Sequence, residues 1–178
     1  MMNELIRPAL QDEALLADIA AARPLENELH LWWLGQSGFL VQWRGKHMLL
    51  DPYLSESLTK KYATTDKSHI RMTQCPIAPT RLDFIDVVTS SHNHTDHLDH
   101  ETLGPLRQAN PALTMIILAA NRAFVADRLQ CDPQWPLGVN DGTSVSAKGF
   151  TFTGLAAAHE QLERDENGNY PCLLPHQL

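Results

Sequence analysis

Residues 91–100 read Ser91-His92-Asn93-His94-Thr95-Asp96-His97-Leu98-Asp99-His100, with four histidines and two aspartates in the nine positions from 92 to 100. Imidazole and carboxylate groups are the ligands that suit zinc, manganese or iron in proteins. The run directly follows the apolar segment 84–89, whose β-branched residues are typical of a buried strand. A ligand-rich loop at the end of such a strand predicts a metal site at a sheet edge, in preference to a merely solvated loop.

The spacing within this loop predicts how its side chains point. His92 and His94 alternate around Asn93, so an extended backbone would direct both imidazoles to the same side. Asp96 and His97 are adjacent, and they can face a second position only where the chain turns. The pattern therefore suits two metal ions roughly 3.5–4 Å apart that share a hydroxide.

The segments around the loop predict an α/β fold. The apolar patterns and turn residues predict strands over 28–34, 39–43, 47–51, 84–89, 114–119, 144–147 and 150–155. A short helix is expected from about His100, capped by Asp99, and a second one over 121–129. The alternation of strand and helix in the second half of the chain places it in the α/β class.

The N-terminal residues 1–24 are predicted to be a helical extension. Leu15, Leu16 and Ile19 recur at helical spacing, and Pro24 ends the pattern. The remaining residues, 25–178, have the length of one domain with a sizeable core.

Composition excludes several classes of protein. The net charge of −7 argues against binding to nucleic acid or to an anionic membrane surface. No apolar run approaches the roughly 20 residues of a membrane span, and the acidic N-terminus lacks a signal-peptide layout, so a cytoplasmic location is expected. The three cysteines are far apart and odd in number, which favours reduced thiols over a disulfide framework.

The motif His92-x-His94-x-Asp96-His97 resembles the HxHxDH signature of the metallo-β-lactamase-fold hydrolases. Residues 33–39 (Trp-Leu-Gly-Gln-Ser-Gly-Phe) and 49–54 (Leu-Leu-Asp-Pro-Tyr-Leu) look like the opening of one branch of that superfamily. This branch holds L-ascorbate-6-phosphate lactonase and the N-acylphosphatidylethanolamine phospholipase D-like enzymes. The resemblance runs from about residue 31 to about residue 160, and it implies an αββα sandwich represented by its N-terminal half and part of its second half.

The resemblance also implies a set of metal ligands. His159 follows the predicted strand 150–155 and resembles the third-motif histidine, which would join His92 and His94 on one ion. Three protein nitrogens and an open water position are the coordination of a catalytic zinc site. Asp96 and His97 would serve the second ion and act as catalytic residues. Zinc or manganese, with iron as a further candidate, is expected at one or two ions per chain.

Residues outside the loop are expected to support it. Asp51 precedes Pro52 at a strand end, and we interpret it as a carboxylate that orients the metal-binding histidines, with an ordinary turn aspartate as the alternative. The long polar segment 55–80 is expected to lie over the site mouth, with a merely solvated loop as the alternative. Its candidates for contact with an anionic substrate are Lys60, Tyr62 and Arg71, together with Lys61 and His69.

The chain departs from the family pattern after residue 160, since only eighteen residues follow and none matches the family's bridging aspartate or final histidine. Two hypotheses follow. The first is a metal-dependent hydrolase that uses a metal-bound hydroxide on a lactone, ester or phosphodiester of a small anionic substrate. The alternative is a catalytically incomplete metal-binding fragment. A homo-oligomer or a completing chain is a further expectation, and a redox or sulfur-transfer member using non-haem iron ranks last.

Overall fold

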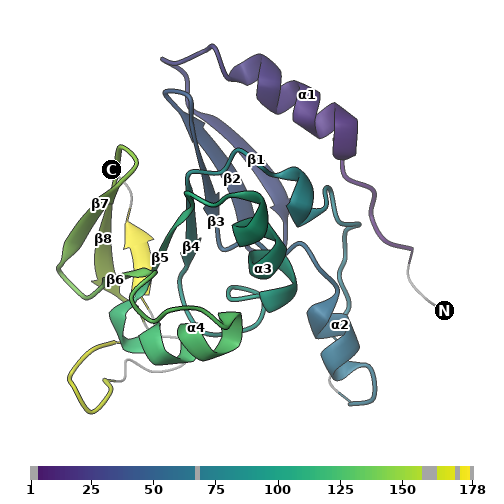
Figure 1. Ribbon diagram of the computed structural model, residues 1–178. Coiled ribbons are helices and arrows are strands. Elements are labelled where there is room, and N and C mark those ends of the chain that lie inside the picture. The colour runs from purple at the N-terminus through teal and green to yellow at the C-terminus, as the bar shows by residue number, and fades with distance from the viewer. Residues whose placement is uncertain (1–3, 67–68, 158–163, 171–172, 177–178) are drawn as a thin grey trace.

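A six-stranded mixed sheet forms the centre of the computed structural model, which describes residues 4–66, 69–157, 164–170 and 173–176 (Figure 1). Its strands, in spatial as in chain order, are β1 (His30–Gly35), β2 (Gly38–Trp43), β3 (Lys46–Leu50), β4 (Val87–Ser90), β5 (Thr114–Leu118) and β6 (Leu137–Val139). The strands β1 to β3 are antiparallel neighbours, whereas β3 to β6 run parallel. The carboxyl ends of β3 and β4 therefore lie side by side, and the histidine-rich loop leaves the sheet from β4.

A smaller antiparallel sheet and four α-helices make up the rest of the regular structure in the described residues. The small sheet has the order β7-β8-β9, with β7 at Ser144–Ala147, β8 at Phe150–Ala156 and β9 at Leu173–His176. The helices are α1 (Asp12–Ala22), α2 (Ser57–Tyr62), α3 (His100–Ala109) and α4 (Arg122–Leu129), and two 3₁₀ turns span Pro79–Arg81 and Ala119–Asn121. Figure 1 shows α3 and α4 in front of the large sheet and the small sheet at its β6 end.

The two-residue alternation of the strands divides the core into two layers. Leu40 and Leu49 point to the helices and pack with apolar residues of α1, α3 and α4. Val41 and Met48, one position along, point to the opposite face and join Phe152 of the small sheet. The order of layers is therefore helices, large sheet and small sheet, which confirms the predicted α/β class. The N-terminal helix α1 contributes Leu15 and Ile19 to the same core.

One α-helix and two strands of the described chain were not expected from the sequence. The segment 55–80 contains α2, and a short strand, β6, extends the large sheet. The C-terminal tail, for which no strand was predicted, pairs as β9 with β8, and Pro175 lies opposite Gly154. β9 is an edge of its sheet in this part of the chain, and an edge strand tolerates a residue without an N–H donor.

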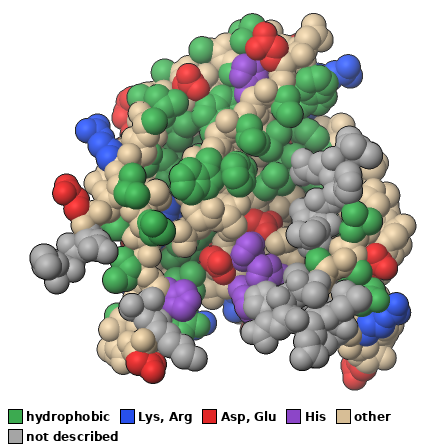
Figure 2. Space-filling model, turned by 180° about the vertical axis from the view of Figure 1, so that it is seen from behind, with side chains coloured by type: hydrophobic (Ala, Val, Ile, Leu, Met, Phe, Trp, Pro, Cys, Tyr) green, Lys and Arg blue, Asp and Glu red, His purple; other side chains and the backbone are tan. Residues whose placement is uncertain are grey.

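Part of the sheet face on the small-sheet side remains uncovered. Leu31 and Trp33 of β1 stand opposite Val41 and Phe39 of β2, and 58% and 59% of their surfaces are exposed. Figure 2 shows a broad hydrophobic area on this side of the molecule.

Among the described helices the longest, α1, has 11 residues, and none has the length and apolar character of a membrane span.

A buried arginine ties the segment after β3 to the sheet. The Arg71 guanidinium donates to the carbonyl oxygens of Tyr53 at 2.6 Å and Thr73 at 3.1 Å, and it lies over the Tyr53 ring at 5.1 Å. It packs against Gly35, where a Cβ atom would meet Thr73 Oγ1 at 2.8 Å and Arg71 Nη2 at 2.9 Å. Because Gly35 also has a φ of +91°, both its backbone and its surroundings require glycine.

We predict that Gly35→Ala lowers the free energy of unfolding by about 1–3 kcal/mol, because the added methyl group must displace the Arg71 and Thr73 side chains. The control is Gly45→Ala, which has a φ of +70° but nothing within 4 Å of the added Cβ. It imposes backbone strain without the clash, so its loss should be smaller. Urea unfolding of the three proteins measures both values, and equal losses would contradict this account of Gly35.

A buried histidine in β3 predicts a pH dependence of stability. His47 is 1% exposed, and burial, with the nearby charges of Arg23 and Lys46, lowers its pKa despite the opposing effect of Asp86. Below about pH 6.5 the unfolded chain therefore binds a proton that the folded chain resists, so acidification lowers the free energy of unfolding. We expect a shallower fall between pH 7 and pH 5 in His47→Gln. If the free energy of unfolding falls by the same amount between pH 7 and pH 5 in both proteins, His47 makes no such contribution.

Candidate metal centre

The loop between β4 and α3 gathers three imidazole rings. The ring centroids of His92 and His97 are 3.9 Å apart, and those of His92 and His94 are 4.8 Å apart. The chain turns sharply here, since the backbone N–H groups of His97 and Leu98 both donate to the His94 carbonyl at 3.0 and 2.8 Å. This turn brings Asp96 to the same place, with Oδ2 3.5 Å from His97 Nε2.

Asp51 supports the loop from the end of β3. Its carboxylate lies 2.7 Å from His97 Nδ1 and accepts hydrogen bonds from the Ser91 hydroxyl, the Ser91 backbone N–H and the Thr89 hydroxyl. Asp51 has a φ of 41°, a left-handed conformation that is uncommon outside glycine. The hydrogen-bond donors that surround its side chain thus meet at a turn of the backbone. The parallel register of β3 and β4 puts these residues within reach of one another.

The hydrogen bond between Asp51 and His97 leaves Nε2 of the ring directed toward Asp96. Metal-binding histidines usually donate their other ring N–H to a carboxylate, which sets the tautomer and the ring orientation. The arrangement thus has the chemistry expected around a metal-binding imidazole, and its position agrees with the orienting role inferred for Asp51.

The charges around the loop follow from these contacts. Burial opposes protonation of His97, but the hydrogen bond and charge of Asp51, with Asp96, raise its pKa above the ordinary value. Burial also disfavours the Asp51 carboxylate, but hydrogen bonds from His97, Ser91 and Thr89 hold its pKa below the ordinary value. Burial and the nearby His97 and His94 lower the pKa of His92 to about 4. His92 is therefore neutral at pH 7, which is the form that binds a metal.

Neighbouring elements hold the loop backbone in place. Ser37, in the turn between β1 and β2, donates to the carbonyl of Asp96 at 3.1 Å. Arg128 of α4 donates to the carbonyls of Asn93 at 2.8 Å and Leu98 at 3.3 Å. Asp99 caps α3 by accepting from the backbone N–H of Glu101, as the sequence predicted. Sequence patterns did not reveal the roles of Ser37 and Arg128, because both residues make contacts with residues distant in the chain.

The donor set fits a divalent metal, although the described residues do not complete a site. His92, His94, Asp96 and His97 supply imidazole and carboxylate donors in one loop. Among the residues that the structure describes, no three His, Cys, Asp or Glu side chains are arranged to hold one ion. His159, the expected third imidazole of the first ion, lies outside the described residues.

The expected substrate-binding residues take different places. Tyr62 lines a cavity of about 380 Å³ beside the loop, together with Lys61 and His69. Lys60 does not line it, because it forms an ion pair with Glu101 at 2.7 Å. Arg71 is buried and engaged by backbone carbonyls, so the structure does not bring it to this cavity.

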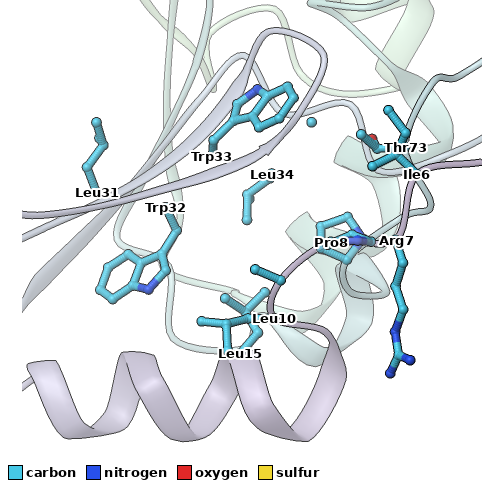
Figure 3. A pocket seen from close by; sticks show the side chains of 13 residues that line it. Ile6, Arg7, Pro8, Leu10, Leu15, Leu31, Trp32, Trp33, Leu34 and Thr73 are labelled. Carbon is cyan, nitrogen blue, oxygen red and sulfur yellow. The ribbon is translucent and has the colours of Figure 1, made fainter.

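A second cavity, of about 410 Å³, lies away from this chemistry between the N-terminal segment and β1 (Figure 3). Its walls include Leu10, Leu15, Trp32 and Leu34, and no acidic, histidine or cysteine side chain in the described part of the chain lines it. Of these two cavities, the one beside the histidine-rich loop is lined by candidate metal ligands, His94 and Asp96.

Comparisons with known proteins agree with this geometry. The model of the Beta-lactamase superfamily domain matches residues 30–173. A Saccharomyces cerevisiae mitochondrial N-acyl-phosphatidylethanolamine-hydrolyzing phospholipase D is 39% identical over 71 residues, which cover 40% of this chain and 14% of that protein. A UPF0173 metal-dependent hydrolase of Saccharolobus solfataricus is 23% identical over 142 residues, covering 78% of this chain and 54% of the relative. The chain thus spans at most about half the length of these curated relatives.

One solved structure illustrates the likeness of fold. The apo form of chemotaxis sensor ODP from T. denticola superposes with a TM-score of 0.50 at 16% identity, covering 80% of this chain and 53% of the sensor. The family model spans more than half of the chain and includes β1 to β8 and the histidine-rich loop. The resemblance read from the HxHxDH motif is confirmed: the chain belongs to the β-lactamase superfamily.

Proposed function

We propose that this chain is a metal-dependent hydrolase acting on a lactone, ester or phosphodiester of a small anionic substrate. The observation that carries the proposal is the hydrogen-bonded group of Asp51, Ser91 and His97 beside a loop of candidate metal ligands. The two curated relatives support hydrolysis, since one is named a metal-dependent hydrolase and the other a phospholipase D, a class that hydrolyses phosphodiesters.

Each residue of the loop has a proposed role. His92 and His94, with His159, would hold one ion, and Asp96 and His97 a second. When bound, a divalent metal supplies Lewis acidity and lowers the pKa of water from 15.7 toward about 7. Asp51 keeps the His97 ring oriented through Nδ1, and Asp96 with His97 would position the attacking group or protonate the leaving group. We propose zinc or manganese as the metal, with iron as the alternative.

A second candidate function is metal binding without turnover. It is favoured by one observation, that the described residues bring no three ligands into position around one ion. The two candidates differ in a measurable way, because only the hydrolase requires a metal-dependent rate.

We expect purified protein to contain about two ions per chain if both sites form, and His92→Ala/His94→Ala to lose at least one of them. Hydrolysis of an aryl phosphodiester and of a lactone should stop on chelation and return when zinc or manganese is added. Elemental analysis and the two assays measure this, with circular dichroism confirming that the chelated protein stays folded. Turnover that persists after chelation would refute the hydrolase proposal. Bound metal without turnover on either substrate would support the second candidate.

We also predict that Asp51→Asn weakens metal affinity about 10–100-fold, because the neutral amide orients His97 less strongly and no longer supports its basicity. Asp86→Asn is the matched control: Asp86 lies before β4 and bonds Lys46 and the His47 backbone, away from the loop. Competition with a chromogenic chelator gives the affinities. Similar affinities for the two variants would show that Asp51 does not act on the metal.

A further inference from the structure

The cavity beside the histidine-rich loop has walls from four parts of the chain. Among the residues that the structure describes, these are α2, the segment that follows it, the loop itself and α4. Its volume of about 380 Å³ lies within the range of small-molecule sites. A ligand in this cavity would touch His94 and Asp96, so it would lie directly against the proposed metal centre.

Two cations line this cavity from separate elements. Lys61 extends from α2, and no acidic side chain among the described residues pairs with it. Arg128 extends from α4 and is half-buried, and only its Nη1 atom donates to the loop carbonyls in the described part of the chain. The guanidinium therefore keeps donors for a further acceptor. The adjacent Lys60 differs, since Glu101 already neutralises it.

Aromatic side chains flank both cations. Tyr62 and His69 stack with ring centroids 4.4 Å apart, and Lys61 Nζ lies 5.2 Å from the Tyr62 ring centre. The Arg128 guanidinium lies 4.3 Å from the Phe124 ring centre. Such contacts hold the long cationic side chains near the cavity while their charges stay available, and the aromatic faces offer a surface for the body of an organic ligand.

We propose that Lys61 and Arg128 form a subsite for the anionic group of an organic phosphate or carboxylate, adjacent to His94 and Asp96. The two residues would determine specificity by holding the anion while the bond to be hydrolysed faces the loop. That the bound anion belongs to a substrate rests on the proposed function. Binding of the anion itself requires neither hydrolysis nor a bound metal. Arg128 would also position the loop, through its hydrogen bonds to Asn93 and Leu98.

The test measures ligand binding to the full chain by NMR and by calorimetry. Both methods are applied to the protein as purified and after chelation. The probes are glucose 6-phosphate, glucuronate and uncharged glucose. We expect either or both charged probes to bind more tightly than glucose, with and without metal, and more weakly at high salt. The phosphate and carboxylate probes distinguish the two sources of the anion.

Variants locate the site of binding. Lys61→Gln and Arg128→Gln should each weaken binding of the preferred anion about tenfold, as expected for loss of one charge-assisted contact. Arg128→Lys, which keeps the charge, should lose less. Lys60→Gln is the matched control, and it should bind like the unmodified protein because Lys60 is already paired. If Arg128→Gln fails to fold, Lys61→Gln and Arg128→Lys still decide the question.

The outcomes separate this proposal from the proposed function. Anion binding that depends on Lys61 and Arg128 in a protein without hydrolase activity would support the subsite and refute the hydrolase. Hydrolysis with a KM unchanged in both variants would support the hydrolase and overturn the subsite. Equal binding of charged and uncharged probes, or binding that requires metal but neither cation, would also overturn it.

Discussion

The partly buried hydrogen bond between Asp51 and His97 is the interaction on which the candidate centre depends. It joins the end of β3 to the loop after β4 across 46 residues of sequence, at 2.7 Å. A carboxylate so enclosed is tolerated only because it accepts several hydrogen bonds, and those donors come from β4 and the start of the histidine-rich loop. The same contacts thus satisfy the charge of Asp51 and orient His97.

The sheet makes this interaction possible by bringing two strand ends together. Strands β3 and β4 are parallel neighbours, so both chains leave the sheet at the same edge. Apolar residues on both faces keep the strands in register: Leu49 and Val88 pack toward the helices, and Met48 and Val87 pack toward the small sheet. A shift of one residue in either strand would exchange these faces and move Asp51 away from His97.

Much of the fold could be predicted from the sequence, and less of the site. The α/β class followed from the alternation of apolar segments, and the spacing of His92, His94, Asp96 and His97 pointed to the loop in which the structure gathers these side chains. The strand β9 could not be expected, because Pro175 is locally unfavourable and is accepted only at a sheet edge. Arg71 and Arg128 illustrate a similar limit. Both are arginines, but one is buried and holds backbone carbonyls in place, whereas the other lines the cavity. Contacts between distant residues decide this difference.

The buried Arg71 has a consequence for how such a protein can diversify. Its hydrogen bonds to Tyr53 and Thr73 close the base of a long excursion from the sheet, and α2 with Lys61 and Tyr62 belongs to the part beyond that closure. The outer part can therefore accept substitutions while the base and the histidine-rich loop keep their places. Under the proposed function, changes in substrate preference would come from exchange of side chains in this outer part, while the candidate metal ligands stay on the loop after β4. A structural arginine outside that loop would thus allow recognition to change separately from chemistry.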